Sequence, residues 1–281
     1  MSRQNVVIVN WANLSDADLA TGVNALQTQV SGDFAPFWGR DAALLPLSRS
    51  SGCGSWTWRE LTPSSGGRRG VRRSAGRYPD YWALILLDEE LDTASEGDPC
   101  RVYRERTRDG QPLTKVFVNR VPEGNDWCHA ASRALLDMLA DPYCSVTAYH
   151  HPNGAAREFN ALTVCDPVAG YVDGYASSGR WVSNFTHPAY WSPGPSRPGS
   201  GIKFDERGRV SRAFQVTRSG RLGYYDFAAS SWRMREGSNP VVSPPEVESR
   251  LEQRNRQTHD TPDAEAPDPV DPGPTGALYP P

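Results

Sequence analysis

Apolar positions in the first 40 residues form a continuous run and then a helical stripe. Residues 6–9 (VVIV) are all β-branched, which is typical of a buried strand. Four apolar residues then recur at spacings of four, three and four: Leu19, Val23, Leu26 and Val30. This period predicts a helix with one apolar face, capped by Ser15 at its start. We expect Gly32 and Pro36 to end that helix.

The middle of the chain predicts further strands. Residues 81–88 (YWALILLD) form a strongly apolar run that ends in a carboxylate, and residues 115–119 (KVFVN) form a shorter one. Between them, the charged segment 103–110 runs into an Asp-Gly pair, which favours a turn. We therefore expect this segment to be a strand at an edge.

A second helix is predicted over residues 127–140, with Asp126 as its N-cap and Asp141-Pro142 as its end. Its apolar face is formed by five residues: Cys128, Ala131, Leu135, Leu136 and Leu139. Residues 143–235 are rich in turn formers and aromatics, and we expect short strands and long loops there. These elements together predict an α+β fold with a small mixed sheet and a loop-rich second half.

Composition separates one domain, residues 1–238, from two unusual segments. Residues 239–281 form an acidic tail in which ten prolines fall after residue 239. Such a segment cannot bury enough apolar surface to offset its ordering entropy, so we expect disorder. The second segment is an insertion at about 51–80 that is rich in Gly, Ser and Arg.

The insertion carries five arginines within ten positions: Arg68, Arg69, Arg72, Arg73 and Arg77. They could contact an anion or nucleic acid, but a solvated loop is the simpler interpretation. The net charge of −3 gives no general indication of a nucleic-acid partner. The five cysteines are an odd number without a C-x-x-C pair, and no apolar run is long enough for a signal peptide or membrane span. We expect a cytoplasmic protein without a membrane partner.

The predicted helix carries the most informative motif of the chain. Segment 132–142 (SRALLDMLADP) resembles the active-site helix of a zincin-like metalloprotease family of bacteria and phages, whose pattern reads Ser-His-Glu-x-Leu-Glu-Met-Leu-x-Asp-Pro. Four other segments are also similar to family motifs: 33–39 (DFAPFWG), 102–104 (VYR), 163–168 (TVCDPV) and 182–191 (VSNFTHPAYW). The resemblance covers roughly residues 5–230 and implies a zincin-like α+β fold.

The chain departs from this family at the positions that carry its chemistry. Arg133 and Ala134 replace the family's metal-ligating His and its catalytic Glu, while Asp137 keeps the acid four residues further on. Thr163 stands where the family tends to have a Glu. Arginine offers no lone pair to a metal and alanine cannot act as a base. We hypothesise that an Arg133–Asp137 pair takes over the structural role of the metal.

A rebuilt site is the alternative. His129 and Asp137 are weak candidates for metal ligands, in which case zinc would be the cofactor; otherwise no cofactor is expected. Cys128 or Cys165 could serve as a thiol nucleophile, although an inert buried thiol is the simpler interpretation. His187, Asp166 and Tyr190 lie in the distal motifs and are the candidate binding residues.

The sequence thus favours a catalytically degenerate, metalloprotease-like protein that binds a protein or peptide partner without cleaving it. An active metal-dependent hydrolase, rebuilt around Asp137, His129 or His187, is the first alternative. The second is a structural or accessory component of a phage or phage-derived particle.

Overall fold

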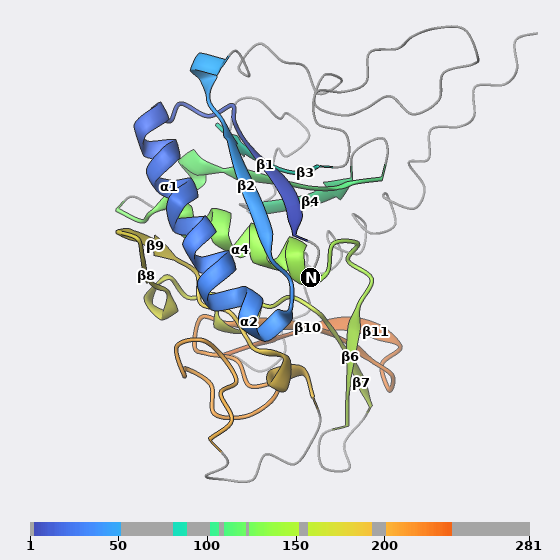
Figure 1. Cartoon of the computed structure of the whole chain (residues 1–281). Helices are drawn as coiled ribbons and strands as arrows, with labels where there is room; N and C mark the ends of the chain where they lie inside the picture. The colour runs from blue at the N-terminus through green and yellow to red at the C-terminus, as the bar shows by residue number, and fades with distance from the viewer. Residues whose placement is uncertain are drawn as a thin grey trace, which may run out of the picture.

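The computed structural model describes seven stretches of the chain, shown in colour in Figure 1: residues 3–51, 81–88, 102–106, 110–121, 124–151, 157–192 and 201–237. The five arginines of the insertion lie outside the described residues, and so does the tail from residue 238 onward. None of the helices in the described part is long and apolar enough to cross a membrane.

The first half of the chain forms a mixed five-stranded sheet. Its strands, in spatial order, are β2 (Ala42–Leu47), β1 (Gln4–Asn10), β3 (Trp82–Leu87), β5 (Pro112–Phe117) and β4 (Val102–Arg106). The first four strands run parallel, and β4 pairs antiparallel with β5 at the edge. The strands predicted at 6–9, 81–88 and 103–110 are confirmed, whereas β5 begins and ends earlier than the 115–119 run suggested.

Helix α1 (Asp16–Thr28) begins at the predicted cap, where the Ser15 side chain accepts a hydrogen bond from the Asp18 N–H. The predicted end is wrong. The chain continues through Gly32 as a π-helical turn, η1 (Gln29–Phe34), and then as α2 (Ala35–Trp38). Pro36 lies in the first turn of α2, where a missing N–H costs no hydrogen bond. Gly39, with φ of 65°, ends the helical segment.

Helix α4 (Trp127–Ala140) has the predicted bounds and the predicted N-cap, because the Asp126 carboxylate accepts a hydrogen bond from the Cys128 N–H. The sequence predicted that one apolar face of α4 is buried, but the buried surface is much larger. Every residue of α4 except Arg133 is buried. The helix lies between the five-stranded sheet and the second half of the chain, which together enclose it (Figure 1).

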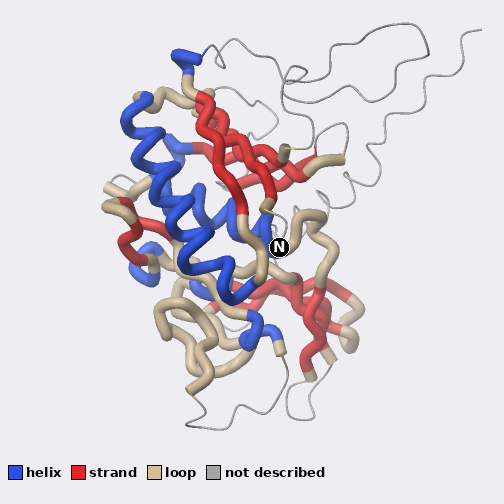
Figure 2. The backbone as a smooth tube through the Cα atoms, viewed as in Figure 1, coloured by secondary structure: helices blue, strands red, loops and turns tan. Residues whose placement is uncertain are grey.

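The second half contains short strands and long loops, as expected (Figure 2). Four strands form an antiparallel sheet in the order β11 (Ser231–Glu236), β10 (Arg221–Asp226), β7 (Glu158–Ala161) and β6 (Thr147–His150). A separate hairpin joins β8 (Tyr175–Ser177) to β9 (Arg180–Val182). Three short 3-10 turns complete this half: η7 (Asp166–Val168), η8 (Tyr171–Asp173) and η9 (Pro188–Trp191). The fold of the described residues is mixed α/β with few helices, in line with the α+β class.

Alternation along the parallel strands divides the core into two parts. Val6 and Ile8 of β1 face α1 and α4 and belong to the larger cluster, which also includes residues of the second half. Val7 and Val9 face the opposite side and form a smaller cluster with residues of β3 and β5. The face that carries the larger cluster therefore positions α4.

Close packing between α1 and α4 gives a first testable prediction. A Cβ added at Gly22 would lie 2.3 Å from Cζ2 of Trp127 and 2.9 Å from Sγ of Cys128. We expect Gly22→Ala to destabilise the fold by about 1–3 kcal/mol, because the buried α4 cannot move away. Gly32→Ala is the matched control, since nothing lies within 4 Å of its added Cβ, and it should be neutral or slightly stabilising. Urea denaturation measures both; equal effects would contradict the tight contact.

Candidate functional site

The motif segments that are far apart in the sequence meet around α4. Oγ of Ser132 accepts a hydrogen bond from the Ser183 N–H at 2.7 Å. Oδ1 of Asp137 accepts one from the Cys165 N–H at 3.2 Å. Segments 163–168 and 182–191 are thus both anchored on the same helix by side chains that the sequence motif contains.

The same segments are also joined to each other and to segment 33–39. The N–H and hydroxyl of Thr186 donate to the carbonyl oxygen of Val164 at 2.7 and 2.9 Å. Nε1 of Trp38 donates to the Thr186 carbonyl at 2.9 Å. The rings of Phe34 and Phe185 lie edge to face, with centroids 5.4 Å apart. Four of the five motif segments therefore form one connected shell.

Arg133 is the residue of α4 that is partly exposed, with 21% of its side chain accessible to solvent. Its guanidinium forms an ion pair with Asp166, whose side chain is only 2% exposed. Nε of Arg221, on β10, lies 3.8 Å from the same carboxylate oxygen of Asp166. We expected Asp137 as the partner of Arg133, but the ion pair that the structure gives to Arg133 reaches across to η7.

The two other degenerate positions also lie at this site. Ala134 is fully buried, so the space at the position of the family's catalytic base is closed to solvent. Oγ1 of Thr163 is a buried atom without a hydrogen-bond partner in the described residues. A zinc ion of the kind that the resemblance implies does not fit these residues, because Arg133 stands at the position of a ligand, offers no lone pair and stays positively charged.

The weak metal candidates do not lie together. His129 and Asp137 are eight residues apart on α4, which corresponds to about 12 Å along the helix axis. This separation is too large for both side chains to reach one ion. Among the residues that the structure describes, no three His, Cys, Asp or Glu side chains are grouped so as to hold a metal.

The three candidate binding residues are buried. His187 is 2% exposed, stacks on Phe37 with ring centroids 3.7 Å apart, and has its Nε2 3.1 Å from a Glu206 carboxylate oxygen. Burial lowers the pKa of His187, although the nearby Glu206 opposes this effect. Asp166 is the buried acid of the Arg133 ion pair, and the Tyr190 hydroxyl donates to the Gln215 carbonyl at 2.8 Å. A partner on the surface cannot reach these groups without a rearrangement.

Thiol chemistry is also disfavoured by the geometry. Cys128 and Cys165 are fully buried. Burial raises the pKa of both thiols far above the ordinary value, and nearby carboxylates add to the shift. Little thiolate would be present at neutral pH, so neither cysteine is placed as a nucleophile.

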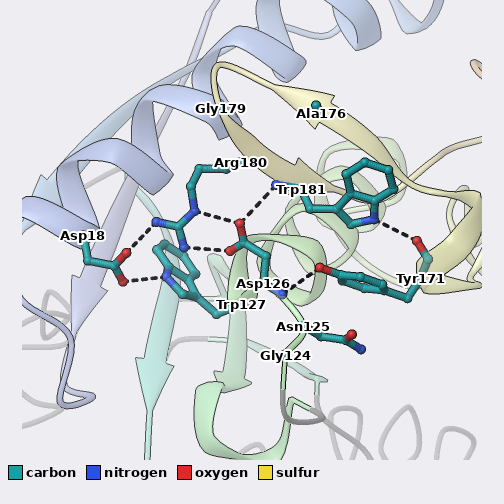
Figure 3. A pocket seen from close by; sticks show the side chains of 10 residues that line it. All are labelled: Asp18, Gly124, Asn125, Asp126, Trp127, Tyr171, Ala176, Gly179, Arg180 and Trp181. Atoms are coloured by element: carbon teal, nitrogen blue, oxygen red, sulfur yellow. Dashed lines mark hydrogen bonds and ion pairs between the residues drawn. The ribbon is translucent and has the colours of Figure 1, made fainter.

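The described residues also line an open pocket of about 610 Å³, at the N-terminal ends of α1 and α4 and the β8–β9 hairpin (Figure 3). Its centre is a network in which Arg180 donates two hydrogen bonds of 2.7 Å to Asp126 and one of 2.5 Å to Asp18. Nε1 of Trp127 donates to the other oxygen of Asp18 at 2.8 Å. None of the residues singled out by the motifs lies in this pocket.

This network, the Arg180 clamp, consists of Arg180, Asp18 and Asp126. It holds the hairpin against both helices. Burial alone would raise the pKa of Asp126, but hydrogen bonds from Arg180 and from the N–H groups of Cys128 and Trp181 lower it to about 2. Asp126 was expected at a helix start from the sequence, whereas no local signal distinguished Arg180 from other arginines. The single guanidinium of Arg180 is shared by two carboxylates, and these hydrogen bonds give the clamp a structural role.

Comparisons with known proteins give no match: neither a family model, nor a curated protein, nor a solved structure matches this chain. The resemblance of segment 132–142 to zincin-like metalloproteases therefore stays a prediction from the sequence. The interpretation of the site rests on the contacts described above.

The Arg180 clamp predicts a specific loss of stability in acid. The folded pKa of Asp126, about 2, lies below its ordinary value of 3.8. Its contribution is therefore present above about pH 4 and is lost as the pH falls toward 2. We expect about 1–2 kcal/mol, because partial exposure screens the pair. Asp126→Asn keeps the N-cap but removes the charge, so the stability difference from the natural chain should shrink between pH 5 and pH 2.5.

Arg180→Met provides the control for this experiment. In that background, Asp126→Asn should have a much smaller effect at pH 7, because the partner of the carboxylate is already absent. A difference between the natural chain and Asp126→Asn that stays constant with pH would contradict the clamp.

The buried Asp166 gives a second prediction for this site. Asp166→Asn leaves Arg133 and Arg221 without the acid between them, and we expect a loss of about 3 kcal/mol in the free energy of unfolding. Arg133→Met should cost clearly less, because Arg221 still faces the carboxylate and the aliphatic stem is kept. Chemical denaturation of both variants measures the difference. An Asp166→Asn variant as stable as the natural chain would contradict a structural ion pair.

Proposed function

We propose that the protein is a catalytically degenerate, zincin-like protein that acts by binding a protein or peptide partner without cleaving it. One observation carries this proposal. At the two positions that the resemblance assigns to catalysis, Arg133 is held in an ion pair with Asp166, and Ala134 is fully buried. Both positions thus have a packing role in this chain.

Metal-dependent peptide hydrolysis needs an ion that polarises the carbonyl and a base that activates water. An arginine cannot supply a ligand to the ion, since its guanidinium stays protonated and has no lone pair. A base at position 134 would be enclosed by protein rather than facing a substrate. Metal-dependent hydrolysis thus lacks both a metal ligand and a base at these positions. The described residues around α4 supply neither.

The family is suggested by the sequence resemblance alone. The arrangement around α4 supports the proposal of a zincin-like scaffold. The mixed sheet packs against an N-terminal helix and α4, and the segments that resemble family motifs converge on α4. The positive charge of Arg133 stands at the position of the family's first metal ligand. Its ion pair with Asp166 joins α4 to η7, so a salt bridge connects elements that a metal would otherwise join.

Metal content and peptidase activity test this proposal together. We expect far less than one zinc atom per chain in protein purified without chelators. A mixture of casein peptides should remain intact on long incubation, and a chelator should change nothing. Elemental analysis measures the first quantity and mass spectrometry of the peptides measures the second.

The alternatives have distinct outcomes. About one zinc per chain, with cleavage that a chelator abolishes and that Asp137→Asn or His187→Gln removes, would establish a rebuilt hydrolase. Cleavage that remains in both variants would point to a contaminating protease, which active-site titration of the preparation can identify. Recovery of the chain as a stoichiometric part of a large particle would favour the accessory role instead.

A further inference from the structure

The antiparallel sheet of the second half carries aromatic side chains in register across all four strands. Tyr149 of β6 pairs with Phe159 of β7, Phe159 pairs with Tyr225 of β10, and Tyr225 pairs with Trp232 of β11. Phe227 lies just beyond the end of β10, and its ring contacts both Phe159 and Tyr225. We call these five residues the aromatic row.

The rings of the aromatic row touch one another. Their centroids are 5.8 Å apart for Tyr149 and Phe159, and 5.1 Å apart for Phe159 and Phe227. Tyr225 lies 5.3 Å from Phe227 and 5.8 Å from Trp232. The interplanar angles of these four pairs run from 61° to 83°. The row is therefore a continuous surface of rings that meet edge to face.

Most of this surface is open among the described residues. Tyr149 is 42% exposed, Phe159 37% and Phe227 45%, while Tyr225 and Trp232 are half-buried. The opposite face of the same sheet packs into the larger core through residues such as Leu222. Contiguous exposed aromatics of this kind mark interaction surfaces, because water contact with them is unfavourable.

Arg157 places a positive charge at one end of the exposed face. It is exposed, lies beside Phe227 and has no ion pair with any described residue. Glu158, which pairs with Arg235, and Asp226, which pairs with Arg233, lie on the opposite face. Glu236 shares the face of Trp232 by alternation, but it lies at the far end of β11. A ligand at the Phe227 end of the row should therefore be apolar in part and carry a carboxylate for Arg157.

We propose that the aromatic row binds the chain's own residues 260–274 (DTPDAEAPDPVDPGP). This segment has five carboxylates, five prolines and no Lys or Arg. Proline-rich segments favour an extended polyproline II conformation and dock in aromatic-lined grooves. Pro269 and Pro272 are one turn of that helix apart and so present their rings on one side. The acids suit Arg157.

The chain can reach the site. The tail follows β11 directly, and Trp232 lies four residues before the end of that strand, about 13 Å away along it. Residues 238–259 provide 22 positions between β11 and the proposed segment, which can span up to roughly 70 Å. A tethered ligand of this kind competes at an effective concentration of about 1 mM, so even a weak site would be occupied.

Single-stranded nucleic acid fits the row less well. Bases bind by stacking flat on exposed ring faces, and most of the affinity comes from several cations along the backbone. Here the rings meet edge to face, and Arg157 is the exposed arginine that alternation places on this face of β6, β7, β10 and β11. Exposed ring edges and a single exposed arginine suit a proline-rich acidic peptide better.

Competition in the full-length chain tests the proposal. The probe is a fluorescein-labelled peptide with the sequence of residues 260–274, and anisotropy reports its binding. In the tail variant, Pro267, Pro269, Pro272 and Pro274 are replaced by Ser within the full chain. We expect the probe to bind this variant about tenfold more tightly than the natural chain, because the chain's own segment no longer competes.

Substitutions in the aromatic row provide the second arm. In the tail variant, Phe227→Ser and Tyr149→Ser should each weaken probe binding about tenfold. Both side chains are exposed, so the fold should be kept, which circular dichroism checks. Val172→Ser is the matched control, since Val172 is 73% exposed and lies outside the row. Arg157→Gln should weaken binding a few-fold and reduce its salt dependence.

Three results would overturn the proposal. The first is that the natural chain and the tail variant bind the probe equally well, or that neither row substitution changes the affinity for the probe. The second is self-association, measured by sedimentation, that the row substitutions abolish and the tail variant leaves unchanged, which would make a second copy the occupant. The third is row-dependent binding of a labelled oligothymidine that the probe peptide cannot displace, which would favour nucleic acid.

Discussion

The burial of α4 on nearly all sides is the constraint on which the rest of the structure depends. Thirteen of its fourteen residues are buried, although only five of them are large and apolar. The sheet covers one side through Val6, Ile8 and Leu84, and the second half covers the other. Its start is held by the Asp126 cap and the Arg180 hydrogen bonds, which also fix the β8–β9 hairpin. Everything that could form a site is placed relative to this helix.

This burial decides what the helix can do. A catalytic helix must show one face to a substrate, whereas among the described residues Arg133 is the single position on α4 that is not buried, and it is only partly exposed. Asp166 is too deeply buried to stay charged without partners, and Arg133 and Arg221 supply them. The ion pair is thus needed for Asp166 to be buried in its charged form. It holds η7 and β10 to α4, and a zinc ion at the same place would leave Arg133 facing another cation.

Local patterns in the sequence predicted the elements well, because they depend on neighbouring residues. Ser15 and Asp126 cap their helices as expected, and the apolar runs form strands. The errors came from tertiary packing. Gly32 did not end the first helix, since the chain continues there as a π-helical turn that buries Gln29, Val30 and Phe34. The partner of Arg133 was expected four residues away on the same helix, but the ion pair forms with a deeply buried acid 33 residues further along, which needs nearby cations to stay charged.

The aromatic row is a second feature that the sequence did not predict. Each strand contributes one or two aromatics to it, and none of them is unusual by itself in a β-strand. The row exists only because the register of β6, β7, β10 and β11 places these residues opposite one another. Sheet registers depend on contacts between distant segments, so composition cannot reveal such a surface. The acids and prolines of residues 260–274 read by themselves as a spacer, and only the exposed aromatic surface on the same molecule motivates the proposal that they bind it. A sequence segment and a surface can thus suggest a hypothesis together when neither is distinctive alone.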